Sequence, residues 1–123
     1  MAKILIADDQ VEIRRLIAYR LEKKSHQIVM AHDGVEAIAA LSKDKFDLAI
    51  LDISMPKKSG LDVLQFIRHH NDNLHLPVIM LTASALSNHY DEAVEYKANI
   101  YLTKPVSSQE MYTAVESLLA EHD

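Results

Sequence analysis

Five short apolar segments alternate along the chain with segments in which apolar residues recur at helical spacing. A continuous apolar run is typical of a strand buried on both faces of a parallel sheet. Because parallel strands need crossover connections of one hand, strict alternation predicts a central sheet with helices on both faces. The predicted strands are Lys3–Ala7, Gln27–Ala31, Asp47–Asp52, Pro77–Thr82 and Ile100–Leu102.

Polar residues mark where the intervening helices are expected to begin. Asp9 is expected to cap the first helix, with Glu12 completing a capping box, and Asp33 and Glu36 repeat that pattern. A weaker helical pattern covers residues 88–97. Two further helix starts are expected at Ser59 and Ser107. The apolar residues at helical spacing are Ile13, Leu16, Ile17 and Leu21 in the first helix, and those expected to face inward in the others are Val35, Ile38, Leu41, Leu61, Leu64, Ile67, Met111, Val115, Leu118 and Leu119.

The length and the order of elements together predict the fold class. A chain of 123 residues suits one domain, and 49% hydrophobic residues can build a core. We therefore expect a single domain over residues 1–123 with an α/β fold. The expected architecture is flavodoxin-like and doubly wound, a (βα)5 chain whose five parallel strands have the order 2-1-3-4-5.

Composition excludes several classes of function. The net charge of −5 argues against a broad nucleic-acid interface, which needs clustered lysine and arginine. The chain has no cysteine, so disulfides and thiolate metal sites are ruled out. No apolar run is long enough to span a bilayer, and the first residues lead into a strand instead of resembling a signal peptide. We expect a cytoplasmic protein.

Chemically useful side chains follow the predicted strands. Asp8 and Asp9 end the first strand, Asp52 ends the third, Thr82 ends the fourth and Lys104 follows the fifth. In open α/β sheets, ligands bind in the crevice beyond the carboxyl ends of the strands. The topology would bring these five residues to one pocket.

This set of residues suits phosphoryl chemistry supported by a metal ion. Three carboxylates in one crevice repel each other, and a cation would relieve the repulsion. Magnesium prefers oxygen ligands, and the lack of cysteine also favours a hard cation. Asp52 could act as a nucleophile toward a phosphoryl group, with Lys104 as a second positive charge and the Thr82 hydroxyl as a hydrogen-bond donor.

The combined motifs resemble the receiver domain of two-component response regulators. The resemblance extends from Lys3 to about Leu119, and it is the combination of motifs that makes it specific. The motifs that carry it are Asp8-Asp9, Asp52 with Met55-Pro56 and Gly60, Thr82-Ala83, and Tyr101-Leu102-Thr103-Lys104-Pro105.

The resemblance implies a phosphoacceptor and a metal site. Asp52 would accept the phosphoryl group. Asp9 would bind Mg²⁺ directly, Asp8 mostly through water, and Asp52 and the backbone carbonyl of Ser54 would complete the protein ligands. Mn²⁺ is expected to substitute for Mg²⁺.

The resemblance also implies a conformational switch. Lys104 would pair with Asp52 and with the phosphoryl group. The Thr82 hydroxyl would be drawn to that group while the Tyr101 ring turns inward. The peptide bond before Pro105 would be cis, as X-Pro bonds can be.

Three positions bear on how this chain differs within the family. Lys97 stands where family members often have glycine, and a side chain tolerates a positive φ poorly, so the end of the fourth helix is expected to be reshaped. Ser54 and Ser84, two residues after Asp52 and Thr82, are small and polar, which leaves water access to the phosphoryl group open.

The expected partners are proteins. A histidine kinase or histidine phosphotransfer protein would donate the phosphoryl group, and the face formed by the fourth helix, fifth strand and fifth helix would contact a downstream protein. Direct nucleic-acid and membrane binding are not expected. The chain would assist its own phosphorylation and dephosphorylation without being a multiple-turnover enzyme.

Two alternatives remain open. The first is a magnesium-dependent phosphohydrolase of the haloacid-dehalogenase kind, which resembles a pattern with a second aspartate two residues after the first. Ser54 occupies that place here, so the general acid is missing. The second alternative is a scaffold with a receiver fold that works without phosphorylation.

Overall fold

The computed structural model describes residues 1–69, 75–83, 94 and 96–121. Apart from residues 94, 96 and 97, the helix predicted at 88–97 lies outside the described residues. The strands are β1 (Lys3–Ala7), β2 (Gln27–Ala31), β3 (Leu48–Asp52), β4 (Val78–Thr82) and β5 (Ile100–Thr103). The described helices are α1 (Val11–Glu22), α2 (Gly34–Lys43), α3 (Gly60–His69) and α5 (Ser108–Glu121). All five predicted strands are therefore confirmed to within one residue at either end.

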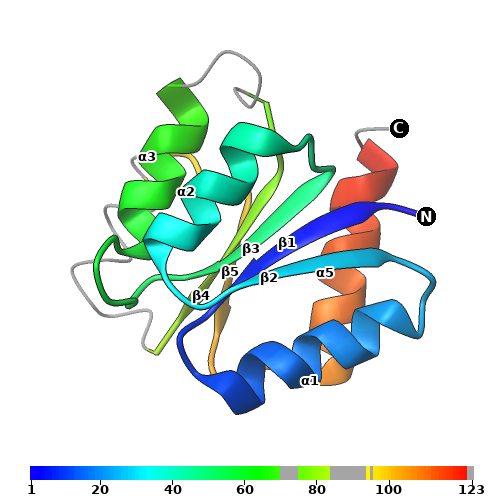
Figure 1. Cartoon of the computed structure of the whole chain (residues 1–123). Coiled ribbons are helices and arrows are strands. Elements are labelled where there is room, and N and C mark those ends of the chain that lie inside the picture. Colours follow the sequence, from blue (N-terminus) through cyan, green and yellow to red (C-terminus); the bar gives the residue numbers. More distant parts are fainter. Residues whose placement is uncertain (70–74, 84–93, 95, 122–123) are drawn as a thin grey trace.

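The strands form one parallel sheet in the order β2-β1-β3-β4-β5, which confirms the predicted topology. β1 lies inside the sheet, with Ile6 in register with Met30 of β2 and with Ile50 of β3. Helices α2 and α3 cover one face of the sheet, and α1 and α5 cover the other (Figure 1). This is the doubly wound arrangement, in which the carboxyl ends of all strands meet at one edge.

Three of the four described helices begin where the polar residues predict. Asp33 accepts a hydrogen bond from the Glu36 amide at 2.8 Å, as an N-cap does. Ser59 and Asp62 form a reciprocal capping box at α3, in which the Asp62 amide donates to Ser59 Oγ and the Ser59 amide donates to Asp62 Oδ2. Ser107 and Glu110 form the same box at α5.

The start of α1 differs from the prediction. The helix begins at Val11, its N-cap is Gln10, and Asp9 is exposed. The Gln10 amide donates to Asp8 Oδ1 at 2.9 Å, so it is the Asp8 carboxylate, and not that of Asp9, that accepts a backbone hydrogen bond at this turn. The expected capping box of Asp9 and Glu12 is therefore wrong.

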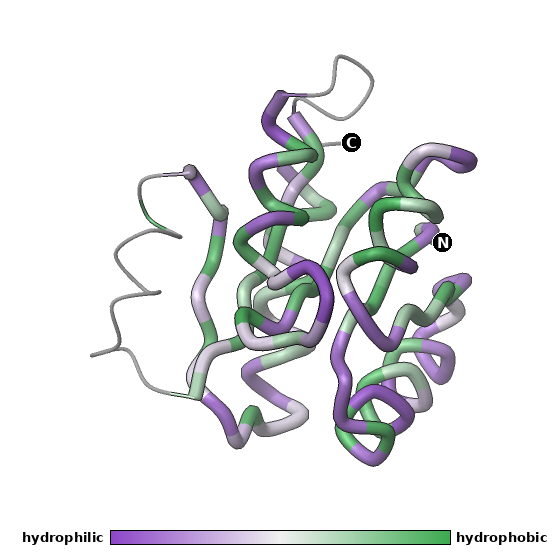
Figure 2. Tube along the Cα trace, turned by 60° about the vertical axis from the view of Figure 1, so that its left-hand side comes forward, coloured by the Kyte–Doolittle hydropathy of each residue, from purple (hydrophilic) through white to green (hydrophobic). Residues whose placement is uncertain are grey.

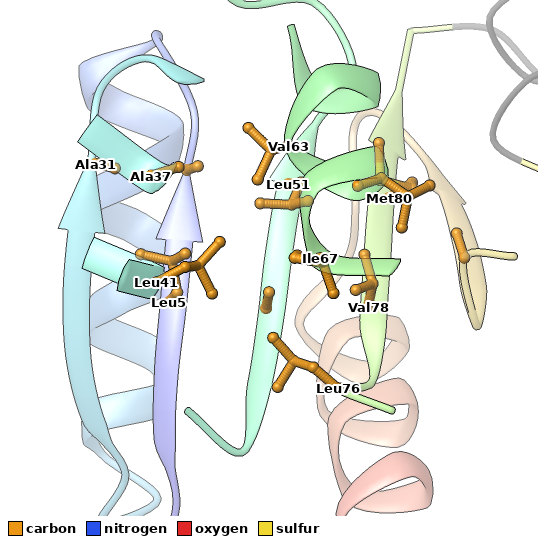
Figure 3. Close-up of a cluster of buried hydrophobic side chains, with 14 of the residues drawn as sticks. Leu5, Ala31, Ala37, Leu41, Leu51, Val63, Ile67, Leu76, Val78 and Met80 are labelled. Atoms are coloured by element: carbon orange, nitrogen blue, oxygen red, sulfur yellow. The ribbon is translucent and has the colours of Figure 1, made fainter. Parts of the chain in front are cut away.

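Two apolar cores fill the space between the sheet and the helices. The core under α2 and α3 takes Leu41 from α2, Val63 and Ile67 from α3, and Leu51 and Met80 from the sheet, all pointing into one layer (Figure 3). The core under α1 and α5 joins their buried residues to the opposite face of the same strands. Along the trace, the strands are mainly hydrophobic and the helices alternate between hydrophobic and hydrophilic residues (Figure 2).

One residue that was predicted to face inward is exposed instead. Val35 is 48% exposed, because the buried stripe of α2 runs through Gly34, Ala37 and Leu41. Leu119 is only partly buried at the edge of the second core. None of the described helices is long and apolar enough to cross a membrane.

Candidate functional site

The acidic residues predicted at the strand ends meet at the carboxyl edge of the sheet. Asp8 follows β1 and is fully buried, while Asp52 ends β3 and is 5% exposed. Asp9 is exposed at the rim. Each of the three offers a carboxylate oxygen, and these oxygens lie within 4.8 Å of one another. Oxygen ligands at such spacing suit a hard divalent cation.

Lys104 supplies the positive charge of this cluster. Its Nζ lies 3.0 Å from Asp8 Oδ2 and 3.3 Å from Asp52 Oδ2. The Lys104 side chain is 16% exposed, and its backbone amide donates to the Thr82 carbonyl at 2.8 Å. The following Lys104–Pro105 peptide bond is cis. The loop after β5 thus holds the lysine over the ends of β1 and β3.

One ammonium group faces more negative charge than it can offset. Burial, followed by the nearby Asp8 carboxylate, raises the pKa of Asp52 to about 7, against the opposing effects of Lys104 and the Ser54 amide. Asp8 Oδ2 is buried and accepts no hydrogen bond from the described residues, despite its ion pair with Lys104. A buried carboxylate oxygen that has only this shared ion pair can still bind a metal, so the three carboxylates suit Mg²⁺.

The loop after β3 brings Ser54 beside Asp52. The Ser54 amide lies 3.4 Å from Asp52 Oδ1, a long contact. The Gly60 amide donates to the Ile53 carbonyl at 2.9 Å and closes the base of the loop. A Cβ on Gly60 would lie 2.8 Å from the backbone carbonyl carbon of Asp52. The start of α3 therefore packs directly on the backbone that carries the candidate nucleophile.

The two residues expected to form the switch lie in neighbouring strands. Thr82 is 3% exposed at the end of β4, in register with Thr103 of β5. Tyr101 is half-buried, and its hydroxyl donates to the Ala98 carbonyl at 3.1 Å. Thr82 thus lies at the same sheet edge as Asp52 and Lys104, whereas the Tyr101 hydroxyl is bonded to the segment before β5.

Two residues at the site were missed by the sequence analysis. Gln10 Oε1 accepts a hydrogen bond from Lys104 Nζ at 3.0 Å, although the two residues are 94 positions apart. Arg14 donates to the Asp8 carbonyl at 2.7 Å. The only sequence signal for Gln10 is its place directly after the acidic pair, on a loop at the ligand-binding edge.

Lys97 adopts the left-handed conformation that favours glycine, with φ of 64°. Arg68 of α3 holds this turn, because its guanidinium donates to the Lys97 carbonyl at 2.9 Å and to Asn99 Oδ1 at 2.9 Å. Lys97 therefore keeps the backbone conformation typical of glycine, and the backbone is not reshaped at this residue. Ser84, the second serine noted in the sequence, lies outside the described residues.

Comparison with known proteins identifies relatives of the whole described fold. The family model for the response regulator receiver domain matches residues 4–116. The transcriptional regulatory protein CpxR of Escherichia coli K12 is 37% identical over 119 residues, which are 97% of this chain and 50% of CpxR. The chain therefore spans about half the length of the curated relatives it matches.

Solved structures show the same fold. The Francisella response regulator 1452 receiver domain superposes with a TM-score of 0.91 at 30% identity, covering 100% of both chains. The chemotaxis response regulator CheY4 of Vibrio cholerae gives a TM-score of 0.90 at 28% identity, covering 96% of this chain and 98% of CheY4.

Proposed function

The chain belongs to the response regulator receiver domain family, and on that premise we propose that Asp52 accepts a phosphoryl group from a phosphohistidine. The observation that carries the proposal is the pairing of this buried carboxylate with Lys104 beside Asp8 and Asp9. Receiver domains act within two-component signalling, so the phosphorylated chain would be a signalling state.

The metal site we propose consists of Asp8, Asp9, Asp52 and the backbone carbonyl of Ser54. Bound Mg²⁺, or Mn²⁺ in its place, would offset the negative charge of the carboxylates and of the incoming phosphoryl oxygens. Asp8 Oδ2, which is buried and accepts no hydrogen bond from the described residues, and the convergence of three carboxylates support this assignment.

Asp52 must be ionised to attack. Its carboxylate oxygen forms the bond to phosphorus, while the bond from phosphorus to the donor's imidazole nitrogen breaks and that nitrogen keeps the electron pair. Lys104 is close enough to the Asp52 oxygen to contact a phosphoryl oxygen placed there, which would stabilise the developing charge. Because Lys104 also donates to Gln10 Oε1 and forms an ion pair with Asp8, the ammonium is held before the donor arrives.

We propose that Thr82 and Tyr101 report the phosphorylated state. The Thr82 hydroxyl would move to a phosphoryl oxygen, and Tyr101 would give up its bond to the Ala98 carbonyl and turn inward. The surface of β5 and α5, with the residues between β4 and β5, would then bind a downstream protein. A histidine kinase or histidine phosphotransfer protein would be the donor, and neither nucleic acid nor membrane is a proposed direct partner.

Intact-mass measurement tests the phosphoacceptor. We expect acetyl phosphate and Mg²⁺ to add one acid-stable, base-labile phosphoryl group per chain, and Asp52→Asn to abolish it. Asp47→Asn is the matched control, because Asp47 lies at the opposite end of the sheet and should leave the adduct intact. An adduct that persists in Asp52→Asn would contradict the proposal.

The same protein separates the alternatives. Multiple turnover of a phosphomonoester that depends on Asp52 would favour the phosphohydrolase. Identical partner binding by wild type and Asp52→Ala, with and without acetyl phosphate, would favour the scaffold. We expect neither result, since the family consists of response regulators.

A further inference from the structure

The loop between β3 and α3, residues 53–59, contains a turn that its own sequence does not favour. Lys57 has a φ of 69°, in the left-handed region, although it is not glycine. A side chain in that region is strained, and such a conformation persists where the surroundings enforce it. The surroundings here belong to the start of α2.

The first contact is between backbones. Gly34, the first residue of α2, lies so close to Lys58 that a Cβ on the glycine would overlap the Lys58 carbonyl group and Cβ. The φ of Gly34 is not positive, so its conformation does not require glycine. Close approach is therefore the reason for a glycine at this helix start, where alanine is otherwise the better helix former.

The second contact is an ion pair. Asp33 is 2% exposed, and its Oδ1 caps α2 through the Glu36 amide. Its other oxygen, Oδ2, lies 3.5 Å from Lys57 Nζ and 3.5 Å from His32 Nε2. One buried carboxylate thus fixes the helix start with one oxygen and reaches the strained turn with the other.

These contacts hold the loop against the start of α2, while its base is closed by the bond from the Gly60 amide to the Ile53 carbonyl. Ser54 lies between the two anchors, next to Asp52. We propose that Asp33, Gly34 and Lys57 are positioning residues that hold this loop against α2 and so place the Ser54 carbonyl at the metal site. The inference rests on the proposed function, because it assigns these residues to that same site.

Metal binding to the full chain gives the main test, with Mn²⁺ as the probe and free Mn²⁺ measured by electron paramagnetic resonance. We expect Gly34→Ala to weaken Mn²⁺ binding about three- to tenfold, since the added Cβ must push the loop away. Ile38→Val is the matched control. It trims a partly buried residue of the same helix without touching the loop, so it should lower the melting temperature and leave the Mn²⁺ affinity unchanged.

Lys57→Met separates positioning from simple electrostatics. Loss of a positive charge near an acidic site would by itself strengthen cation binding. If Lys57 positions the loop, the variant should instead bind Mn²⁺ about two- to threefold more weakly. Lys57 is 66% exposed at its side chain, so this variant should fold even if Gly34→Ala does not. Tighter Mn²⁺ binding by Lys57→Met would overturn the inference.

Amide hydrogen exchange in the metal-free protein is an independent readout. The Ser54 and Met55 amides should exchange faster in Gly34→Ala and Lys57→Met than in wild type, and at the wild-type rate in Ile38→Val. Equal exchange and equal Mn²⁺ affinity in all four proteins would contradict this inference alone. Failure of wild type to bind Mn²⁺, or binding that survives Asp9→Asn, would overturn the proposed metal site and this inference with it.

Discussion

The two ends of the sheet differ in how well their polar and charged groups are paired. At the amino end, Asp47 Oδ2 accepts from the Lys3 amide at 2.8 Å, and His26 Nδ1 accepts from the Ala2 amide at 3.2 Å. Lys3 Nζ pairs with Asp44 at 3.2 Å, where the side chains are 26% and 50% exposed. Each of these groups has its own neighbour or access to water.

At the carboxyl end, two buried carboxylates share the ammonium of Lys104, and Asp8 Oδ2 accepts no hydrogen bond from the described residues. Polar groups at the amino end are therefore paired one to one or reach water, whereas the carboxyl end keeps excess negative charge, which suits the proposed cation. Buried polar groups are normally fully hydrogen-bonded, and the exceptions in natural proteins are expected mainly at functional sites.

Replacement of the lysine at each end should give the largest difference between the two ends in the free energy of unfolding. Lys104→Met leaves two buried carboxylates without their cation, and we expect a loss of about 3–5 kcal/mol in the free energy of unfolding. Lys3→Met removes a partly exposed ion pair and should cost about 0–1 kcal/mol. Urea unfolding at pH 8 in EDTA measures both, and equal losses would contradict the asymmetry.

Removal of a carboxylate should have the opposite effect. In the folded, metal-free chain, burial and the Asp8 carboxylate raise the pKa of Asp52 from its ordinary 3.8 to about 7. The folded state binds more protons across that window, so wild-type stability should fall as the pH rises from about 4 to about 7.

Asp52→Asn removes this titration. We expect the metal-free variant to exceed wild type at pH 8 by on the order of 1–4 kcal/mol in unfolding free energy, and to match it more closely near pH 4. Asp47→Asn, at the other end, should keep the wild-type slope. Parallel pH profiles of wild type and Asp52→Asn would argue against excess charge at the site.

Two neighbouring residues at the start of α3, Gly60 and Ser59, allow a comparison within the carboxyl end itself. Gly60→Ala places a Cβ against the Asp52 backbone, so we expect a loss of about 1–3 kcal/mol and slower phosphorylation by acetyl phosphate. Ser59→Ala removes the N-cap of the same helix at about 1 kcal/mol without displacing Asp52. If both variants are phosphorylated at equal rates, the contact has no part in positioning Asp52.

The smallest expected effect is at the amino end. Burial, followed by the positive N-terminus, lowers the pKa of His26, so the unfolded chain takes up a proton before the folded chain does. Stability should therefore fall as the pH drops below about 6.5, opposite in sign to the effect of Asp52. Because His26 is partly exposed, the difference should stay well under about 1 kcal/mol.

Thermal unfolding in the Asp52→Asn background isolates the His26 effect, and His26→Gln should flatten the curve between pH 5 and 7. An unchanged slope in His26→Gln would show that another group titrates there.

The sequence patterns predicted the elements better than their exact starts. Asp33 was predicted correctly as a cap because its capping partner, the Glu36 amide, lies only three residues along the chain. The capping role predicted for Asp9 was wrong, because the Gln10 amide donates to the Asp8 side chain and α1 begins only at Val11. Val35 was placed inward by its apolar character, although the stripe through Ala37 and Leu41 leaves it exposed.

The candidate site was predictable where residue type and strand end coincide, as at Asp8, Asp52 and Lys104. The contacts of Gln10 with Lys104 and of Arg68 with Lys97 span 94 and 29 residues. Such contacts leave no periodicity in the sequence, so only the folded chain reveals them. The same holds for Gly34, whose role depends on the distant Lys58.

The central claim is that the carboxyl end of the sheet holds excess negative charge that a divalent cation offsets. A carbon-13 NMR titration of the Asp52 carboxyl group tests it most directly. We predict that Asp52 titrates near pH 7 in EDTA and that saturating Mg²⁺ shifts its titration to much lower pH. An ordinary aspartate titration in EDTA, or one that Mg²⁺ leaves unchanged, would contradict the account.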